Sequence, residues 1–151
     1  MCKNSPLSNE AGWIDVNKET LQHNTYPNVW ALGDCSSLPT SKTAAAIVMQ
    51  NQVLTQNMIN YIENKPLSAT YDGYSSCPLV TSYDEVMLCE FDYELKKRET
   101  FWWDQSEPNK LAYKIKADVF PWIYFNRMIQ GKWKGPGPFR NIFNFMKPNS
   151  N

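Results

Sequence analysis

The chain has little of what a metal site or a disulfide-stapled fold requires. It contains one histidine, His23, and four scattered cysteines in 151 residues, and none of the cysteines forms a CxxC pair. A structural zinc site needs four ligands close together, so no metal site is expected. The cysteine density is also low for a small secreted fold held by disulfides.

Net charge is absent as well, because fifteen basic residues balance fifteen acidic ones. A nucleic-acid partner is therefore not expected. The charges are unevenly distributed, however. Residues 63–107 carry ten acids and four bases, whereas residues 110–151 carry eight bases and one acid, Asp118. This basic end predicts a partner for the last part of the chain.

No apolar run approaches the roughly 20 residues needed to cross a bilayer, so a simple transmembrane protein is not expected. The first residues, MCKNSPLSNEAGW, show neither a basic region nor an apolar core typical of a signal peptide. They read as loop from the middle of a protein, and we expect the chain to be a fragment of a longer one.

The first half of the sequence predicts short strands followed by one long helix. Residues 12–17, GWIDVN, are a short strand candidate, and residues 28–34, NVWALGD, have the apolar content of a buried strand. A helix is expected from about residue 42 to residue 63. Ile47, Leu54, Met58 and Ile62 recur on one face of it, and Pro66 ends it.

The second half predicts a hairpin and an amphipathic end. Residues 78–83 (PLVTSY) and 85–93 (EVMLCEFDY) read as two strands. A helix is expected over residues 110–131, broken or kinked at Pro121. The fold class is therefore α/β.

The first candidate site is Gly33-Asp34, at the end of a predicted strand and shortly before a helix. Glycine permits close approach of a ligand, and the carboxylate can accept hydrogen bonds from ligand hydroxyls. The helix N-terminus attracts an anion such as a phosphate, and Lys42 adds positive charge there. A nucleotide-derived cofactor fits this pattern, although an ordinary structural turn fits it too.

Cys77 is the second candidate, on a constrained stretch before Pro78. A reactive cysteine needs a lowered pKa and solvent access, neither of which the sequence reveals, and inert packing is the alternative. Cys89 lies within a strand pattern and is most simply a small core residue. Cys35 adjoins Asp34, whose charge opposes a thiolate.

The basic, aromatic end of the chain is the third candidate. Residues 119–146 mix tryptophan, tyrosine and phenylalanine with lysine and arginine, and so small a body cannot hide all of that apolar bulk. Such segments lie in a membrane interface. A docking surface for another domain or protomer explains the pattern equally well.

These sites occur in an order that resembles the C-terminal part of mitochondrial-type sulfide:quinone oxidoreductase. The resemblance rests on GWIDVNKETLQHNTYPNVWALGDCSSLPTSKTAAA, YDGYSSCPLVTSYDEVMLCEFDY and KADVFPWIYFNRMIQGKWKGP, which cover nearly the whole chain. It implies a flavoprotein with two dinucleotide-binding, Rossmann-like domains. That family oxidises hydrogen sulfide through FAD, reduces ubiquinone and passes sulfur to glutathione, sulfite or sulfide.

The resemblance also implies roles for individual residues. Asp34 matches the aspartate that contacts the ribityl chain of FAD, with Gly33 allowing the approach, and Lys42 matches a lysine at the FAD site. Cys77 matches the redox cysteine that takes the incoming sulfur as a persulfide. The basic, aromatic end matches the segment that touches the membrane and frames the quinone site.

The division implied is residues 1–66 as part of the FAD-binding domain, 67–107 as a hairpin segment carrying the redox cysteine, and 108–151 as the membrane and quinone-site tail. The expected location is the matrix side of the mitochondrial inner membrane. The family's glycine-rich nucleotide motif is absent here, and so is its second redox cysteine, which Cys2 and Cys35 do not match. We therefore expect the isolated chain to be inactive.

Two other interpretations stay open. A quinone-reducing NADH dehydrogenase fragment would share the Gly-Asp motif and the tail, but it would not need Cys77. A non-catalytic membrane-binding or interaction module would need only the tail.

Overall fold

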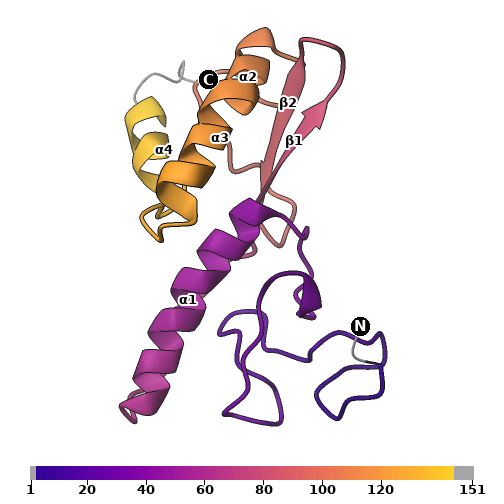
Figure 1. The fold of residues 1–151 in the computed structure, drawn as a ribbon, viewed down its shortest axis with the longest axis vertical. Coiled ribbons are helices and arrows are strands. Elements are labelled where there is room, and N and C mark those ends of the chain that lie inside the picture. Colours follow the sequence, from indigo (N-terminus) through magenta and orange to yellow (C-terminus); the bar gives the residue numbers. More distant parts are fainter. Residues whose placement is uncertain (1–2, 145–151) are drawn as a thin grey trace. The chain divides into compact units, whose positions relative to one another are not determined.

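A computed structural model describes residues 3–144 of the chain (Figure 1). The chain divides into two compact units, Met1–Ser75 and Ser76–Asn151. The first is built around a single long helix, and the second contains a two-stranded sheet and several helical segments. The predicted α/β class is confirmed, whereas the three-part functional division into residues 1–66, 67–107 and 108–151 stays a prediction.

The long helix α1, Ala44–Ile62, agrees with the predicted helix over about residues 42–63. Its start is set by Thr43, whose side chain accepts a hydrogen bond from the Ala46 N–H and so satisfies one of the free amide groups of the first turn. Its end is set by Asn64, which takes the left-handed conformation (φ 54°) typical of a residue that closes a helix. Pro66 follows.

The segment before α1 lies along one side of the helix as irregular chain (Figure 1). The predicted strands at residues 12–17 and 28–34 are wrong. Each makes isolated bridges instead, such as Ile14 with Ser36 and Gln22 with Trp30, and Gly33–Cys35 forms a 3-10 turn. An extended segment becomes a strand only when a neighbour pairs with it over several residues, and in the described part of this unit each pairing is one residue long.

The buried face of α1 is polar, which corrects the predicted apolar face. Met58 and Ile62 are exposed. The residues that are buried are Ala46, Gln50, Asn57 and Asn60, whose spacing is that of one helix face. Their amides bind the irregular chain. Asn57 Nδ2 donates to the carbonyls of Thr20 (3.2 Å) and Ala69 (2.8 Å), and its Oδ1 accepts from the Ala69 N–H (3.0 Å).

The hairpin consists of β1, Ser75–Val80, and β2, Val86–Phe91. The prediction of two strands here is confirmed, but the first begins at Ser75 rather than at Pro78. The two strands pair with each other, and a connection of five residues is long enough only for an antiparallel pair. At the turn, the Thr81 N–H donates to the Glu85 carbonyl at 3.1 Å, which places these two residues opposite each other.

The far edge of β2 is also hydrogen-bonded, and this fixes the register independently. The N–H groups of Val86 and Leu88 donate to the carbonyls of Asn109 (3.3 Å) and Gln105 (3.1 Å). The backbone N–H and C=O groups of the even-numbered residues of β2 thus point away from β1, and those of the odd-numbered residues point toward it. Pro78, which has no N–H, falls at a position of β1 where none is needed. In this register Cys77 lies opposite Cys89.

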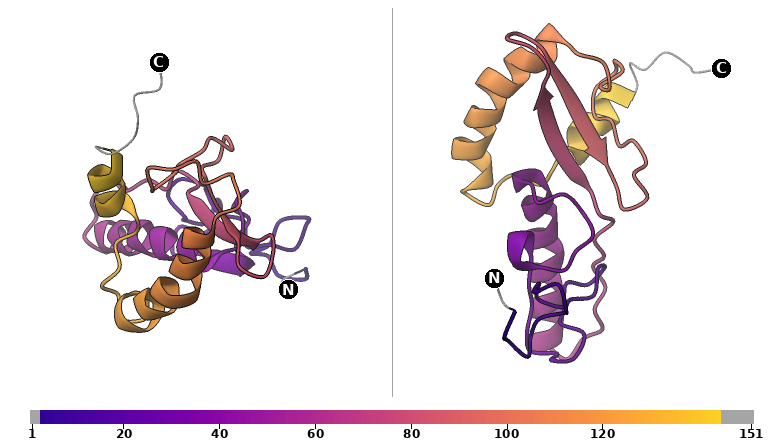
Figure 2. Two further views of the ribbon diagram at one scale, coloured as in Figure 1. Left: turned by 90° about the horizontal axis from the view of Figure 1, so that it is seen from above. Right: turned by 90° about the vertical axis from the view of Figure 1, so that its right-hand side faces the viewer.

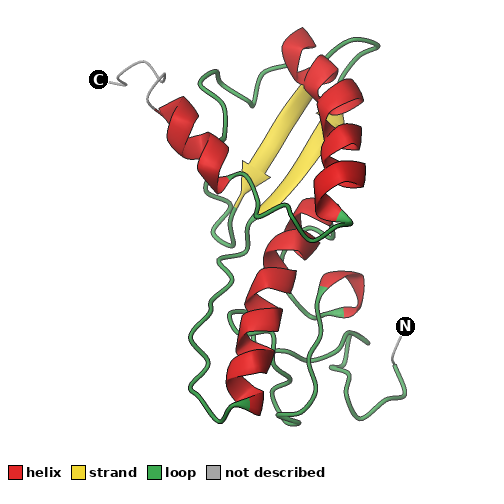
Figure 3. Ribbon diagram, turned by 60° about the vertical axis from the view of Figure 1, so that its left-hand side comes forward, coloured by secondary structure: helices red, strands yellow, loops and turns green. Residues whose placement is uncertain are grey.

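A nearly continuous helical segment covers one face of the hairpin (Figures 2 and 3). It runs through α2 (Lys110–Lys114), a π-helical stretch (Ile115–Val119), α3 (Phe120–Ile123) and a second π-helical stretch (Tyr124–Met128). The chain stays helical through Pro121. In the π-helical stretch before Pro121, the Phe120 N–H donates a hydrogen bond to the Ile115 carbonyl, five residues back. Single π turns of this kind occur as local bulges inside α-helices.

The core of the second unit lies between this helical segment and β2. Val86, Leu88 and Ala112 are buried there, with Phe101 and Trp103 packed against them. The two aromatic rings stack at 4.5 Å. Burying such side chains stabilises the unit by roughly 1.5–3 kcal/mol each.

A buried polar network ties two separate segments to β2, the stretch that carries Thr100 and Gln105 and the helix that carries Arg140. Glu90 accepts from Gln105 Nε2 at 2.9 Å, from Thr100 Oγ1 at 2.7 Å and from Arg140 Nη2 at 3.2 Å. Arg140 belongs to α4, Gly137–Asn144. A paired and hydrogen-bonded buried carboxylate tolerates its loss of water contact, and here it connects β2 to α4.

We predict that Asn57→Ala destabilises the first unit by about 3 kcal/mol, because the Thr20 and Ala69 carbonyls and the Ala69 N–H, all half-buried, lose their partners. Urea unfolding followed by circular dichroism, which reports on α1, measures this. Asn51→Ala makes the same chemical change on an exposed position of α1 and should change stability by less than about 0.5 kcal/mol. Equal effects of the two substitutions would contradict the polar-face interpretation.

Candidate functional site

The Gly33–Asp34 turn is built around a backbone conformation that favours glycine. Gly33 has φ +67°, and a Cβ at this position would lie 3.3 Å from side-chain atoms of Ile47. Its N–H donates to Gln50 Oε1 at 2.7 Å, so this hydrogen bond attaches the Gly33–Asp34 turn to α1. The left-handed conformation costs other residues about 1–2 kcal/mol, which explains the glycine in structural terms.

Asp34 projects from this turn with an exposed side chain, while Gly33 and Ser36 on either side are buried. The Ser36 hydroxyl donates to the Gly33 carbonyl at 2.7 Å and holds the turn closed. The carboxylate is thus presented to solvent by a rigid loop. Such a group can accept hydrogen bonds from ligand hydroxyls without losing a bond inside the protein.

Lys42 is occupied by the loop itself. Its Nζ donates to the carbonyls of Ser36 (2.6 Å) and Leu38 (3.3 Å), and it lies 5.2 Å from the centre of the Trp13 ring. Burial lowers the pKa of Lys42, and the nearby charge of Asp34 opposes that shift. The ammonium group therefore shapes the loop that carries Asp34 and adds positive charge beside it.

The N-terminus of α1 follows this loop within the same unit. The Thr43 side chain satisfies the Ala46 N–H and also lies 3.0 Å from Ser75 Oγ. A helix N-terminus carries partial positive charge and favours anions. The structure thus brings Gly33, Asp34 and Lys42 together in one loop, and the donor set suits a ligand that has both hydroxyls and an anionic group.

Cys77 belongs to the second unit. It is the third residue of β1, half-buried, with a free thiol. It is therefore held by the hairpin rather than by the loop that the sequence predicted. Cys35 is also a free thiol, and its Sγ donates to the Leu32 carbonyl at 3.4 Å.

Cys89 is the functional candidate that sequence reasoning passed over. The hairpin register places it directly opposite Cys77, with both thiols free. Burial raises the pKa of the Cys89 thiol, and the neighbouring Cys77 raises it further. The predicted strands at residues 78–83 and 85–93 could not reveal this pairing, because they leave Cys77 outside the first strand, whereas the structure places Thr81 opposite Glu85 at the turn.

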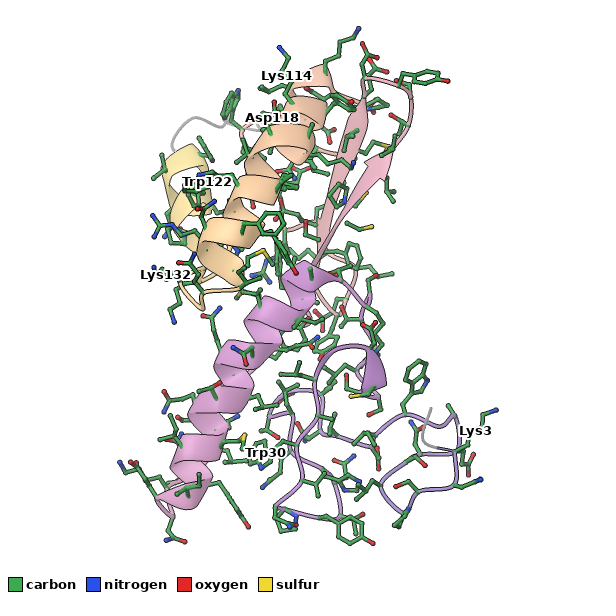
Figure 4. All side chains as sticks on the ribbon, viewed as in Figure 1. Lys3, Trp30, Lys114, Asp118, Trp122 and Lys132 are labelled. Carbon is green, nitrogen blue, oxygen red and sulfur yellow. The ribbon has the colours of Figure 1, made fainter. Side chains whose placement is uncertain are left out.

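The helical end of the second unit exposes large apolar side chains. Trp122, Phe125 and Ile129 are 55%, 61% and 60% exposed, and their spacing along the chain puts them on one side of the segment. Lys114, Asp118 and Trp122 follow one another along it, and Lys132 lies beyond (Figure 4). The Arg127 guanidinium lies 5.9 Å from the centre of the Trp122 ring. The result is an apolar surface with cations beside it.

Within residues 3–144, no helix combines the length and the apolar character that crossing a bilayer would require. In the same range, no three His, Cys, Asp or Glu side chains gather in a way that would hold a metal ion.

Three curated proteins are similar to nearly all of this chain. Each is named mitochondrial sulfide:quinone oxidoreductase. The protein from Mus musculus is 50% identical over 141 residues, that from Dictyostelium discoideum 46% over 140, and that from Schizosaccharomyces pombe 42% over 137. These matches cover 87–93% of the chain. The resemblance to mitochondrial sulfide:quinone oxidoreductase is confirmed.

The chain spans about a third of the length of these curated relatives, 30–31% in each case. This share is consistent with a part of such an oxidoreductase. No family profile matches the chain. Among solved structures, a chain in the cryo-EM structure of the Tetrahymena thermophila mitochondrial ATP synthase is similar with a TM-score of 0.64 and 25% identity. That match covers 99% of the present chain and 33% of the other.

We predict that the pKa of Lys42 lies below 10.5 in the folded chain and falls further in Asp34→Asn. Burial disfavours the ammonium form, and the Asp34 charge is what opposes this effect. Heteronuclear NMR titration of the lysine side chains measures both values. Asp15→Asn removes the same charge elsewhere in the first unit and should leave the Lys42 midpoint unchanged. An unchanged midpoint in Asp34→Asn would show that the two groups do not interact.

Proposed function

We propose that the chain is the C-terminal part of a mitochondrial flavoprotein that oxidises hydrogen sulfide and reduces ubiquinone. The observation that carries this proposal is the 42–50% identity to three sulfide:quinone oxidoreductases over about nine tenths of the chain. The first unit is then part of a Rossmann-like FAD-binding domain. The residues that the resemblance selected lie on a preformed loop and on a hairpin strand, which agrees with such roles.

The Gly33–Asp34 loop fits the ribityl part of FAD. An exposed carboxylate on a closed turn can accept hydrogen bonds from ribityl hydroxyls, and Gly33 permits the left-handed backbone conformation of that turn. The first turn of α1 offers backbone N–H groups to an anionic or carbonyl oxygen. Lys42 keeps the loop in shape through the Ser36 and Leu38 carbonyls. When bound, FAD supplies two-electron redox chemistry.

Cys77 is the residue that receives sulfur. Hydrosulfide attacks a disulfide between Cys77 and a cysteine outside this chain, so that a persulfide forms on Cys77 and the other cysteine leaves as a thiolate. The outer sulfur of the persulfide then passes to glutathione, sulfite or sulfide. The half-buried position of Cys77 in β1 limits access to small acceptors.

The apolar helical surface is the membrane and quinone part of the proposal. Trp122, Phe125 and Ile129 are exposed on it, and the side chains of Arg127 and Lys132, also exposed, supply the positive charge for lipid phosphates. We place the protein on the matrix side of the mitochondrial inner membrane. The isolated chain is proposed to be inactive, because it has neither the glycine-rich nucleotide motif nor the second redox cysteine of the family.

Two alternatives keep specific support. An NADH:quinone-type flavoprotein fragment would use Asp34 and the apolar surface in the same way, without Cys77. A non-catalytic membrane-binding or interaction module would use the apolar surface alone. Cys77 separates the first alternative from the proposal, and enzymatic turnover separates the second.

The decisive test uses a chimera of the Mus musculus oxidoreductase in which the 141 matched residues are replaced by those of this chain. We predict that the chimera reduces quinone with sulfide, and that Cys77→Ser lowers this rate by about two orders of magnitude or more, because the nucleophilic thiol is lost. The assay follows quinone absorbance and, in parallel, the bound flavin spectrum.

Cys35→Ser is the matched control, since it removes a thiol that has no assigned role and should keep the rate within about twofold. Normal turnover of the Cys77→Ser chimera would remove the sulfide proposal. Quinone reduction by NADH in that variant would favour the first alternative.

A separate test addresses the apolar surface in the 151-residue chain itself. We predict that the double variant Trp122→Ser, Phe125→Ser binds anionic phospholipid vesicles about tenfold or more weakly, because two half-exposed aromatic side chains no longer enter the interface. Vesicle co-sedimentation measures the affinity. Tyr83→Ser removes a fully exposed aromatic at the hairpin turn and should bind as the unaltered chain does. Equal binding by both variants would exclude this surface as the membrane contact.

A further inference from the structure

The hairpin brings two thiols to one position on the same face of a sheet. Residues opposite each other in an antiparallel pair direct their side chains to the same side. Cys77 and Cys89 are such a pair, because Thr81 is opposite Glu85 at the turn and the odd-numbered residues of β2 face β1. The register therefore pairs two free cysteines across the strands.

The backbone spacing of this pair suits a disulfide. Opposite residues that exchange both backbone hydrogen bonds have Cα atoms about 5.5 Å apart, inside the range of about 4.4–6.8 Å that disulfides span. Their Cβ atoms are also about 5.5 Å apart, so closing the bond draws the two side chains about 1 Å closer together. Both residues are half-buried rather than enclosed. Cys89 also lines a shallow open depression together with Phe91, Leu95 and Lys97, so the edge of β2 near Cys89 is open to solvent.

The two thiols also influence each other electrostatically. Burial raises the pKa of Cys89, and Cys77 adds to that rise, as expected when a second thiolate would form nearby. A raised pKa makes Cys89 a poor first nucleophile toward an oxidant in solution. It does not prevent attack on a sulfur already held opposite it, because such a step is intramolecular.

We propose that Cys77 and Cys89 form a reversible disulfide across β1 and β2, in which Cys89 is the resolving thiol for a modified Cys77. This assigns a redox partner to Cys77 within the chain itself. The disulfide requires only the two thiols and a small-molecule disulfide such as oxidised glutathione as the oxidant.

The reaction has two exchange steps. The Cys77 thiolate attacks one sulfur of glutathione disulfide, forming a mixed disulfide and releasing one glutathione thiolate. The Cys89 thiolate then attacks Cys77 Sγ, so that the Cys77–Cys89 bond forms and the second glutathione leaves as a thiolate. The two cysteines lose two protons and two electrons in total, and the glutathione disulfide gains them.

One consequence rests on the proposed function, whereas the disulfide itself does not. If Cys77 carries a persulfide, the same attack by Cys89 on Cys77 Sγ breaks the bond to the outer sulfur. That sulfur leaves as hydrosulfide, and the Cys77–Cys89 disulfide remains. Cys89 then competes with small acceptors for the modified cysteine and returns it to a form that hydrosulfide can open again.

The test uses the 151-residue chain incubated with oxidised glutathione under native conditions. Glutamyl endopeptidase cleaves after Glu85, between the two cysteines, so a disulfide is seen as two linked peptides in mass spectrometry. We expect the Cys77–Cys89 link in the unaltered chain and in Cys35→Ser. In Cys89→Ser we expect the glutathione adduct on Cys77 to accumulate about tenfold or more, because the resolving thiol and its high effective concentration are gone.

The same experiment in urea shows whether the Cys77–Cys89 link depends on the folded hairpin or only on the reactivity of the two thiols. Without the hairpin, only loop length decides the pairing, so links from Cys77 to Cys35 and Cys2 should appear beside the Cys77–Cys89 link, which loses the advantage given by the register. A stable glutathione adduct on Cys77 in the native unaltered chain would overturn the inference, as would a Cys77–Cys89 link that is no more frequent in the native chain than in urea. Either result leaves the proposed function intact, since the chimera test of Cys77→Ser does not involve Cys89.

Discussion

Hydrogen bonding of backbone outside regular secondary structure is the constraint on which both units depend. Buried N–H and C=O groups that have no partner cost about 1–3 kcal/mol each, and this chain places long irregular segments against its helix and its hairpin. Three fully buried amide side chains supply the partners. Gln50 binds Gly33, Asn57 binds Thr20 and Ala69, and Gln105 binds the Leu88 carbonyl and accepts from the Phe101 N–H. Regular elements are thus joined to irregular chain by amides rather than by apolar contact alone.

This constraint explains where sequence reasoning about the fold succeeded and where it failed. The cap at Thr43, the left-handed Asn64 and the turn of the hairpin are local signals, so α1 and both strands were predictable. The buried face of α1 was not, because periodicity analysis counts apolar residues as buried. Here the irregular chain beside α1 needs donors and acceptors, and the amides of Asn57 and Gln50 fill that need while Met58 and Ile62 stay exposed.

The candidate site was predictable to a similar degree and for related reasons. Gly33-Asp34 and Lys42 are close in the sequence, and the structure holds them in one loop. What the sequence could not show is that Lys42 donates to loop carbonyls, because the path of an irregular loop depends on contacts such as that of Gly33 with Gln50. Cys89 was read from its strand pattern as core. The strand was predicted correctly, but Cys89 is half-buried. Its position opposite Cys77, which depends on how the two strands pair, is what makes it a candidate for thiol chemistry.

The same backbone requirement connects the core of the second unit to its thiol chemistry. Segment 98–109, including the Gln105 side chain, binds the backbone groups of the even-numbered residues of β2. The side chains of two of those residues, Val86 and Leu88, form the core, and the backbone of the odd-numbered residues pairs with β1. Turning β2 over by one residue would move Val86 and Leu88 out of the core. Shifting β1 by one residue would instead place Pro78 where an N–H is required. The core therefore fixes which face of β2 carries Cys89, and the turn pairing of Thr81 with Glu85 places Cys77 opposite it. The two thiols are thus positioned by the turn and by the packing of the even-numbered side chains, which is the arrangement that the proposed exchange requires.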